Sequence, residues 1–434
     1  MKRSKFKFFT FLSLFGLLTS CGNGSAKLIR SPNEVKDFNA EKLENDDFNN
    51  LRESVHDFSS RFASLAYKDF QNNKNITFSP FSLYSALALV TACAEGNTKD
   101  ELLNALNVDF DVLNENYADL FELVSDKFDE GEISLTNSIW LNSNLDFKED
   151  AINSLADNYY CYSYGADFTN DVEGANKSLT KFIEDKTKGL ISCDLNASDS
   201  TLCFLLNTLY LKDNWFRFGQ DLSEYNTPID FKNSDGSTTN TTLYYGSYSS
   251  GNIYHGDTFS SYYIDTYNGL RLTFMVPNDG YSVDDIFTSE NINLVTDVNS
   301  NDSIYAPNDD ENKVTYFTRA IFPLFEAEFN NDLIEFLKSE FNILDLFSQT
   351  DCDLSGLLAT RGVVTQVRHV TKLKTDRKGI EGAAITAVQL ELTSPDIGAT
   401  YKIVKQDFIV DKSFGFILTD NQGINLFSGV IEKI

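Results

Sequence analysis

Apolar positions along the chain follow two different spacings. Side chains three or four residues apart, such as Leu51, Val55, Phe58 and Phe62, are typical of helices and fill much of the first half. Alternating positions and short all-apolar runs, typical of strands, dominate the second half. The expected helices are 51–70, 82–90, 100–106, 112–128, 151–160, 177–186 and 333–341. The expected strands are 133–141, 202–211, 243–257, 262–267 and 270–276, with a strand–turn–strand unit over 407–432. This order predicts an α+β domain rather than a wound βαβ array.

The N-terminus has the pattern of an export signal. Four cations come first: Lys2, Arg3, Lys5 and Lys7. The apolar run over 8–18 that follows is too short to span a bilayer but suits the core of a signal peptide. The next segment, Leu18-Thr19-Ser20-Cys21-Gly22, resembles the bacterial lipobox, in which the cysteine is lipidated and becomes the new N-terminus. We therefore expect residues 1–20 to be a lipoprotein signal peptide; an ordinary signal peptide with a chance cysteine is the alternative.

Lipidation at Cys21 would anchor the protein to a membrane at the bacterial cell surface, outside the cytoplasm. Residues 21–50 are polar and charged and are predicted to be a tether. Periodic sequence begins near Leu51, and residues 51–434 are predicted to form one domain. Outside the leader, no apolar run is long enough to span a membrane.

The composition narrows the classes of function. The formal net charge is −28, which argues against nucleic acid as a partner and against electrostatic docking on anionic lipid. Only three histidines occur, and the common nucleotide-binding, metalloprotease and hydrolase motifs are absent from the sequence. We expect no cofactor, no metal and no enzymatic activity. A carboxylate pair singled out for catalysis is not recognisable, and a solvated acidic surface explains the many Asp and Glu.

Five cysteines remain beyond the leader, and no two of them have the CxxC spacing. Cys93 and Cys203 lie in apolar runs, where a cysteine usually acts as a small buried apolar residue. Export permits a disulfide, but the sequence does not require one.

Several segments, in a fixed order, resemble the serpin family. They are 75–89 with 94–102, then 207–215, 274–280, 343–347, 353–356, 369–384 and 411–430. The resemblance covers about 51–434. It implies one domain of three β-sheets with eight or nine helices and an exposed reactive-centre loop. It also implies a monomeric suicide inhibitor of serine proteases, occasionally of cysteine proteases, that needs no cofactor.

By this resemblance the reactive loop begins with a hinge. Its residues are Gly379, Ile380, Glu381, Gly382, Ala383 and Ala384. The family mechanism requires the cleaved loop to become a buried strand, and successive side chains of a strand alternate between its faces. One face would carry Ile380, Gly382, Ala384, Thr386, Val388, Leu390 and Leu392, without a charge, and Glu381 and Glu391 fall on the other.

The segment 376–394 contains no proline, so every backbone N–H can join a ladder. An ordinary half-exposed strand over 386–392 would show the same alternation. Three positions depart from the usual hinge of the family. The family usually has Thr or Ser where Ile380 stands, Ala where Gly382 stands, and Glu where Arg377 stands. These departures favour, as an alternative function, a non-inhibitory relative that binds a ligand or partner.

Two positions for the reactive bond follow from family spacing. Counting from Gly379 gives Thr393-Ser394, and counting back from Asp411 gives a bond near Lys402. We prefer the first, because insertion up to Lys402 would bury Pro395 and Asp396. Thr393 or the neighbouring Leu392 indicates an elastase- or subtilisin-like target, and Lys402 would indicate a trypsin-like one.

The resemblance also implies a polar network beneath the sheet, which parts for the loop. Its members would be Ser79, Ser82, Asn207 and His369, with Trp215 at the top of the same opening. A solute-binding lipoprotein or a hydrolase is the alternative from another class, and the missing nucleophile motifs argue against it.

Overall fold

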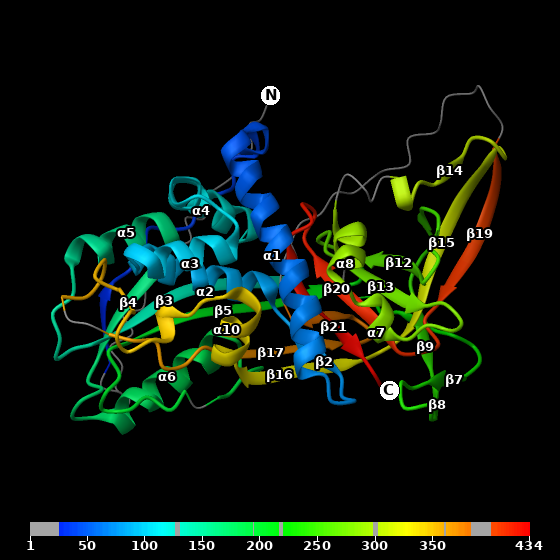
Figure 1. Ribbon diagram of the computed structural model, residues 1–434. Helices are drawn as coiled ribbons and strands as arrows, with labels where there is room; N and C mark the ends of the chain where they lie inside the picture. The colour runs from blue at the N-terminus through cyan, green and yellow to red at the C-terminus, as the bar shows by residue number, and fades with distance from the viewer. Residues whose placement is uncertain are drawn as a thin grey trace, which may run out of the picture.

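The computed structural model describes residues 26–125, 131–193, 195–216, 220–297, 303–359, 362–382 and 401–434. Those residues contain nine α-helices, three large β-sheets and a two-stranded ribbon (Figure 1). The helices are α1 (Asp46–Phe70), α2 (Pro80–Cys93), α3 (Gly96–Leu106), α4 (Phe110–Val124), α5 (Glu149–Tyr159), α6 (Val172–Lys186), α7 (Val283–Ile286), α8 (Ser289–Thr296) and α10 (Ile334–Phe341). The predicted α+β class is confirmed.

The largest sheet has seven strands and mixed direction. Its order is β1 (Lys27–Arg30), β4 (Cys161–Ala166), β3 (Gly131–Asn142), β5 (Cys203–Asn214), β18 (Gly379–Gly382), β17 (Arg368–Thr375) and β16 (Glu326–Asp332). Strand β3 is parallel to β4 and antiparallel to β5. The middle of the sheet therefore combines strands that are far apart in sequence.

The two other large sheets lie at the opposite end of the molecule from β1 (Figure 1). One has the order β10 (Ser249–Ser250), β15 (Val314–Pro323), β9 (Leu243–Tyr245) and β6 (Ser223–Glu224), with β14 (Asn308–Asp309) and β19 (Lys402–Ile409) also paired to β15. The other has the order β11 (Tyr254–His255), β12 (Phe259–Asp265), β13 (Arg271–Pro277), β20 (Phe414–Thr419), β21 (Asn425–Ile431) and β2 (Ile76–Phe78). The ribbon is β7 (Ile229–Lys232) with β8 (Thr238–Thr241).

Helix α2 connects the core to the seven-stranded sheet. Ser79 precedes it in an extended conformation, and Pro80 occupies its first turn, where the missing N–H of proline costs nothing. The helix is apolar on nearly all sides, which is typical of a buried helix, and it packs against α1 and β5.

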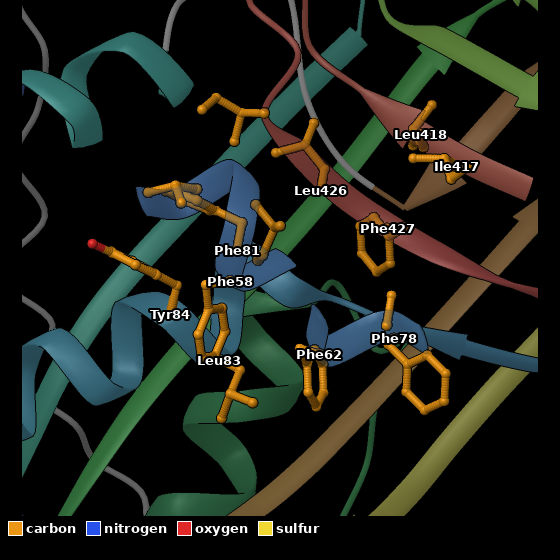
Figure 2. Close-up of a cluster of buried hydrophobic side chains, with 14 of the residues drawn as sticks. Phe58, Phe62, Phe78, Phe81, Leu83, Tyr84, Ile417, Leu418, Leu426 and Phe427 are labelled. Carbon is orange, nitrogen blue, oxygen red and sulfur yellow. The ribbon is translucent and has the colours of Figure 1, made fainter. Parts of the chain in front are cut away.

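Aromatic side chains from α1, α2 and the strand β2 build the centre of the core (Figure 2). The ring of Phe58 meets Tyr84 edge-on at 5.5 Å, and Phe62 meets Phe78 at 5.7 Å. Edge-to-face contacts at such distances are favourable beyond their area of burial. Where β2 pairs with β21, a Cβ on Gly429 would stand 2.0 Å from the carbonyl oxygen of Ile76, so the two strands can approach this closely only at a glycine.

All the helices expected from periodicity are present, with ends that differ by a few residues. The structure also contains elements that the pattern did not predict, among them β4, α7, α8 and β17. Strands β15 and β16 fill part of 277–332, for which the pattern gives no expectation. The interval 21–50, predicted to be a tether, contains β1, a short 3₁₀ helix (Ala40–Glu44) and the first turn of α1. Four residues of edge strand with no buried side chain carry too weak a pattern to be recognised.

Candidate functional site

The predicted hinge lies inside the seven-stranded sheet. Strand β18 pairs antiparallel with residues 211–214 of β5 on one side and with 374–375 of β17 on the other. The side chain of Ile380 is only 1 % exposed and belongs to the core. Glu381 points to the other face, where the hydroxyl of Tyr210 donates to its carboxylate over 2.9 Å. The alternation expected for an inserted strand is therefore present at these two positions.

A tight turn of 376–379 leads from β17 into β18. The carboxylate of Asp376 accepts from the backbone N–H groups of Lys378 and Gly379, at 2.7 and 2.9 Å. A Cβ on Gly379 would stand 1.9 Å from the carbonyl oxygen of Asp213. Only glycine permits so close an approach, so Gly379 lets the hinge fit against β5.

Trp215 holds this turn from the side. Its indole N–H donates to the carbonyl of Asp376, and its backbone N–H donates to that of Lys378, both at 2.8 Å. The side chain is buried, and its ring meets Phe322 at 5.7 Å. Trp215 thus lies at the top of the opening, where the family resemblance implies it.

Asp213 is a buried carboxylate beside the hinge. Thr266, Asn268 and the backbone N–H of Asn214 donate to it, at 2.5 to 3.2 Å. Burial is the larger effect and raises the pKa of Asp213 to about 6, although these hydrogen bonds oppose the shift. The carboxylate ties the top of β5 to the turn between β12 and β13.

Below β18 the two flanking strands separate. Among the described residues, no strand pairs with the side of β5 that faces β17 from Cys203 to Tyr210. A cavity of about 470 Å³ lies here, between the lower half of β5, helix α2 and residues 362–369. A smaller one of about 60 Å³ continues upward toward Tyr210 and Lys372.

The residues predicted for the network line this opening in two separate hydrogen-bonded pairs. Ser82, on α2, donates to Asn207 at 2.5 Å, and Asn207 donates to Asn137 at 2.8 Å. The backbone N–H of Ser79 donates to Nε2 of His369 at 3.2 Å. Asn207 and His369 thus lie on opposite sides of the opening. Each is hydrogen-bonded to a residue at the start of α2, Asn207 to Ser82 and His369 to Ser79.

His369 is a neutral histidine. Its Nε2 accepts a hydrogen bond, its ring is buried, and Phe62 meets it edge-on at 5.6 Å. Burial lowers the pKa of His369 to about 3. A charged imidazolium could not accept from Ser79, so protonation would break the contact.

Two polar residues of the site, one in the network and one beside the hinge, have no counterpart in the sequence prediction. Asn137 on β3 donates to Tyr117 at 3.1 Å and to the carbonyl of Tyr159 at 2.8 Å. The one available signal was a short polar run, Thr136-Asn137-Ser138, between the apolar residues Leu135 and Ile139 of the strand. Asp213 was also missed, although it stands within the segment 207–215 that carried part of the resemblance.

Other predicted residues lie elsewhere or outside the described residues. Cys21, Ala383, Ala384, Leu392, Thr393 and Ser394 are not described. Lys402 is the first residue of β19, and its N–H donates to the carbonyl of Lys313 at 2.8 Å. Cleavage at Lys402 would require this end of β19 to leave the sheet.

In the described part of the chain, no group of three or more His, Cys, Asp or Glu side chains could hold a metal ion. None of the helices described is both long and apolar enough to cross a membrane. Among the described cysteines, Cys93, Cys161, Cys203 and Cys352 are free thiols.

The comparisons with known proteins agree with this architecture. Residues 53–434 match the family described as Serpin (serine protease inhibitor). Serpin A3-6 of Bos taurus is 26 % identical over 378 residues, covering 83 % of this chain and 85 % of its own. An uncharacterized serpin-like protein of Methanosarcina acetivorans is 24 % identical over 385 residues, covering 83 % and 82 %.

Two solved structures illustrate the likeness in fold. The native state of the thermophilic serpin tengpin covers 94 % of this chain and 100 % of its own, with a TM-score of 0.70 and 20 % identity. Cleaved Serpin 42Da covers 89 % and 99 %, with a TM-score of 0.72 and 17 % identity. The three sheets and nine helices described above are therefore those of a known fold.

Proposed function

The chain belongs to the serpin family, and from this premise we propose that it is a surface-tethered suicide inhibitor of serine proteases. Inhibition of proteases is the general activity of the family. The protease would cut the reactive loop, and the cleaved loop would enter the seven-stranded sheet between β5 and β17. Cysteine proteases are a further class of target.

The position of β18 is the observation that carries this proposal. All four of its residues pair with β5, and Ile380 and Glu381 also pair with β17, so an inserting loop needs only to extend an existing ladder. Continued in the same register, the ladder places Thr386 opposite Asn207 on one side and His369 on the other. The strand would thus enter between the two halves of the polar network.

The chemistry of the opening suits this register. Ile380 faces the core, so Gly382, Ala384 and Thr386 would face it as well, and none of them carries a charge. The hydroxyl of Ser79 is buried and has no hydrogen-bond partner among the described residues. The hydroxyl of Thr386 would arrive close to it, and satisfying a buried polar group is favourable.

The reaction itself is a normal first step of proteolysis. The catalytic serine of the protease attacks the carbonyl carbon of Thr393, an ester forms, and the amine of Ser394 leaves after taking up a proton. Insertion of the loop would then carry the protease away from its docking position and distort it before water can hydrolyse the ester. This chain supplies no catalytic group and no cofactor.

Thr393-Ser394 remains our preferred bond, with Leu392 as its neighbour. Both suggest an elastase- or subtilisin-like protease. Lys402 stays as the alternative for a trypsin-like protease, although it begins a hydrogen-bonded strand.

The location of the protein is part of the proposal. Lipid on Cys21 would hold the domain at the outer face of a bacterial membrane. The protein would act there as a monomer. The lipobox resemblance supports this placement.

A denaturing gel tests the function. The purified chain is mixed with elastase-, subtilisin- and trypsin-like proteases, and an SDS-stable band at the summed mass is expected with at least one. Cleavage of the loop by every protease without such a band would contradict inhibition. Mass analysis of the released C-terminal peptide identifies the bond that was cut.

A non-inhibitory binding protein of the same fold is the second candidate. Ile380 and Gly382 favour it, because they depart from the usual hinge residues of the family. Clean cleavage without a gain in heat resistance would support this candidate.

A further inference from the structure

Strand β1 is the first described element of the chain and forms an edge of the seven-stranded sheet. It pairs only with β4, from Lys27 opposite Gly165 to Arg30 opposite Ser163, with an irregularity in between. Arg30 also reaches Asp157 on α5 at 3.1 Å. In the part of the chain that the structure describes, no strand pairs with the outer edge of β1.

This edge lies at the end of the sheet farthest from the hinge. Through the ladders, Lys27 is level with Cys203 at the start of β5, whereas Gly379 is level with Asn214 at its end. Eleven residues of β5 separate the two levels, roughly 37 Å of strand. Strand β19, into which the loop returns, lies at the opposite end of the molecule from β1 (Figure 1).

The exposed side chains of β1 suit the boundary between lipid and water. Leu28 and Ile29 are 55 % and 54 % exposed, and a cation stands on either side of them, Lys27 and Arg30. Aliphatic side chains between two long cationic ones can enter the headgroup layer while the charges stay in water.

The length of chain before β1 limits where the strand can lie. Six residue steps join Cys21 to Lys27, which reach at most about 21 Å when fully extended. A lipid on Cys21 would therefore keep β1 close to the bilayer. The hinge and β19 would be on the far side of the domain.

We propose that the β1 edge, through Leu28 and Ile29, is a docking surface for the lipid bilayer. It orients the inhibitor so that the reactive loop faces away from the membrane. The orientation rests on the proposed anchor at Cys21. A second copy of the chain pairing with the same edge is the competing occupant.

Two label positions at opposite ends of the domain test this orientation. Leu28→Cys and Ile403→Cys replace side chains of similar exposure, 55 % and 64 %, and four of the five native thiols beyond the leader are buried. Each variant of the full chain is expressed in a bacterium that processes lipoproteins, labelled with a fluorophore, and placed in phosphatidylcholine vesicles that carry a headgroup-level quencher. The mass of the N-terminal peptide shows whether Cys21 is acylated.

We expect at least fivefold stronger quenching at position 28 than at position 403. The same labels in a Cys21→Ser background should show no quenching at either position when vesicles are dilute. Adding Ile29→Glu to the lipidated Leu28→Cys protein should reduce quenching at position 28, because a carboxylate would leave the headgroup layer.

Three results would overturn the orientation. They are equal quenching at the two positions of an acylated protein, stronger quenching at position 403, and dimers through β1 that form without vesicles. Each leaves the proposed anchor and the inhibitory function intact. An unmodified Cys21 would instead remove the anchor itself, and the orientation with it, whereas the SDS-stable complex is measured independently of both.

Discussion

Different contacts hold β5 and β17 in the upper and lower parts of the gap between them. At the top, backbone ladders on both sides of β18, the turn of 376–379 and Trp215 join the strands. Below, side chains alone line the opening, through Asn207 and His369, and a cavity of about 470 Å³ remains beside them. A ladder distributes its stability over many bonds, but a side-chain network fails when one member is lost.

The largest effect should come from a charge on the core-facing side of the loop. Thr386→Arg would bring an arginine between Asn207 and His369 on insertion, and burying an unpaired charge costs several kcal/mol. We expect the SDS-stable complex to fall at least tenfold while cleavage of the loop continues. Gel densitometry against a panel of proteases measures both.

Glu391→Arg is the matched control for that variant. It places the same side chain on the opposite face, where a charge already stands. Its yield of complex should stay within about twofold of the parent. An equal loss in both variants would mean that the register taken from β18 is wrong.

Loss of His369 should widen the lower part of the opening between β5 and β17. His369→Ala leaves the N–H of Ser79 without its acceptor, which costs roughly 1–3 kcal/mol. We expect spontaneous insertion or polymerisation on mild heating, visible as new species on a native gel. His255→Ala is the control, because His255 is exposed on β11 and bonds only Ser260 among the described residues. Identical heating profiles for the two variants would contradict the network.

The two parts should also respond to pH with opposite sign. His369 has a folded pKa of about 3, below its unfolded value near 6.5, so its contribution is present above pH 6.5 and is lost as pH falls toward 3. Asp213 has a folded pKa of about 6, above its unfolded value near 3.9, so its contribution is present below pH 4 and is lost as pH rises toward 6. For each group the free energy of unfolding should change by at most about 1.4 kcal/mol per pH unit.

Denaturant midpoints between pH 4 and 7 separate these contributions. In His369→Gln the denaturant midpoint should fall less than in the parent as pH is lowered from 7 to 4. Asp213→Asn should remove the loss on raising pH from 4 to 6. A parent-like pH profile in both variants would mean that neither group titrates as its burial implies.

The smallest effect should come from the surface of the hinge turn. Arg377 pairs with Glu224 at 3.0 Å and Asp221 at 3.4 Å, and all three side chains are substantially exposed. Such pairs contribute about 0–1 kcal/mol. Arg377→Ala should change the melting temperature by no more than a few degrees and leave complex formation intact. A large loss would show that the turn, and not the ladder, holds β18.

The sequence was most informative where side chains repeat at short range. Helices such as α1 follow from spacing alone, since Leu51, Val55 and Phe58 stand on one face. Strand β16 could not be recognised, because only Ala327 and Phe329 of its seven residues are buried, and a polar edge strand carries little pattern.

The site was predictable only in part. The four residues named by the resemblance form two hydrogen-bonded pairs at the opening, Ser79 with His369 and Ser82 with Asn207. It could not supply Asn137, whose contact with Asn207 crosses seventy residues of sequence. Nor could it show that Ile380 is already buried in the sheet, because that depends on how the strands β5 and β17 are spaced.

The ladder register of β18 also fixes where a captured enzyme would finish. Continued to its end, it brings Thr393 level with Ser200, just beyond the start of β5 and near the level at which β1 begins. An ordinary protease domain is roughly 45 Å across, about twice the reach of the six residue steps before β1. With the proposed lipid on Cys21, a captured protease would therefore finish close to the membrane. The domain would then have to rotate relative to the bilayer or release β1 from β4 to make room.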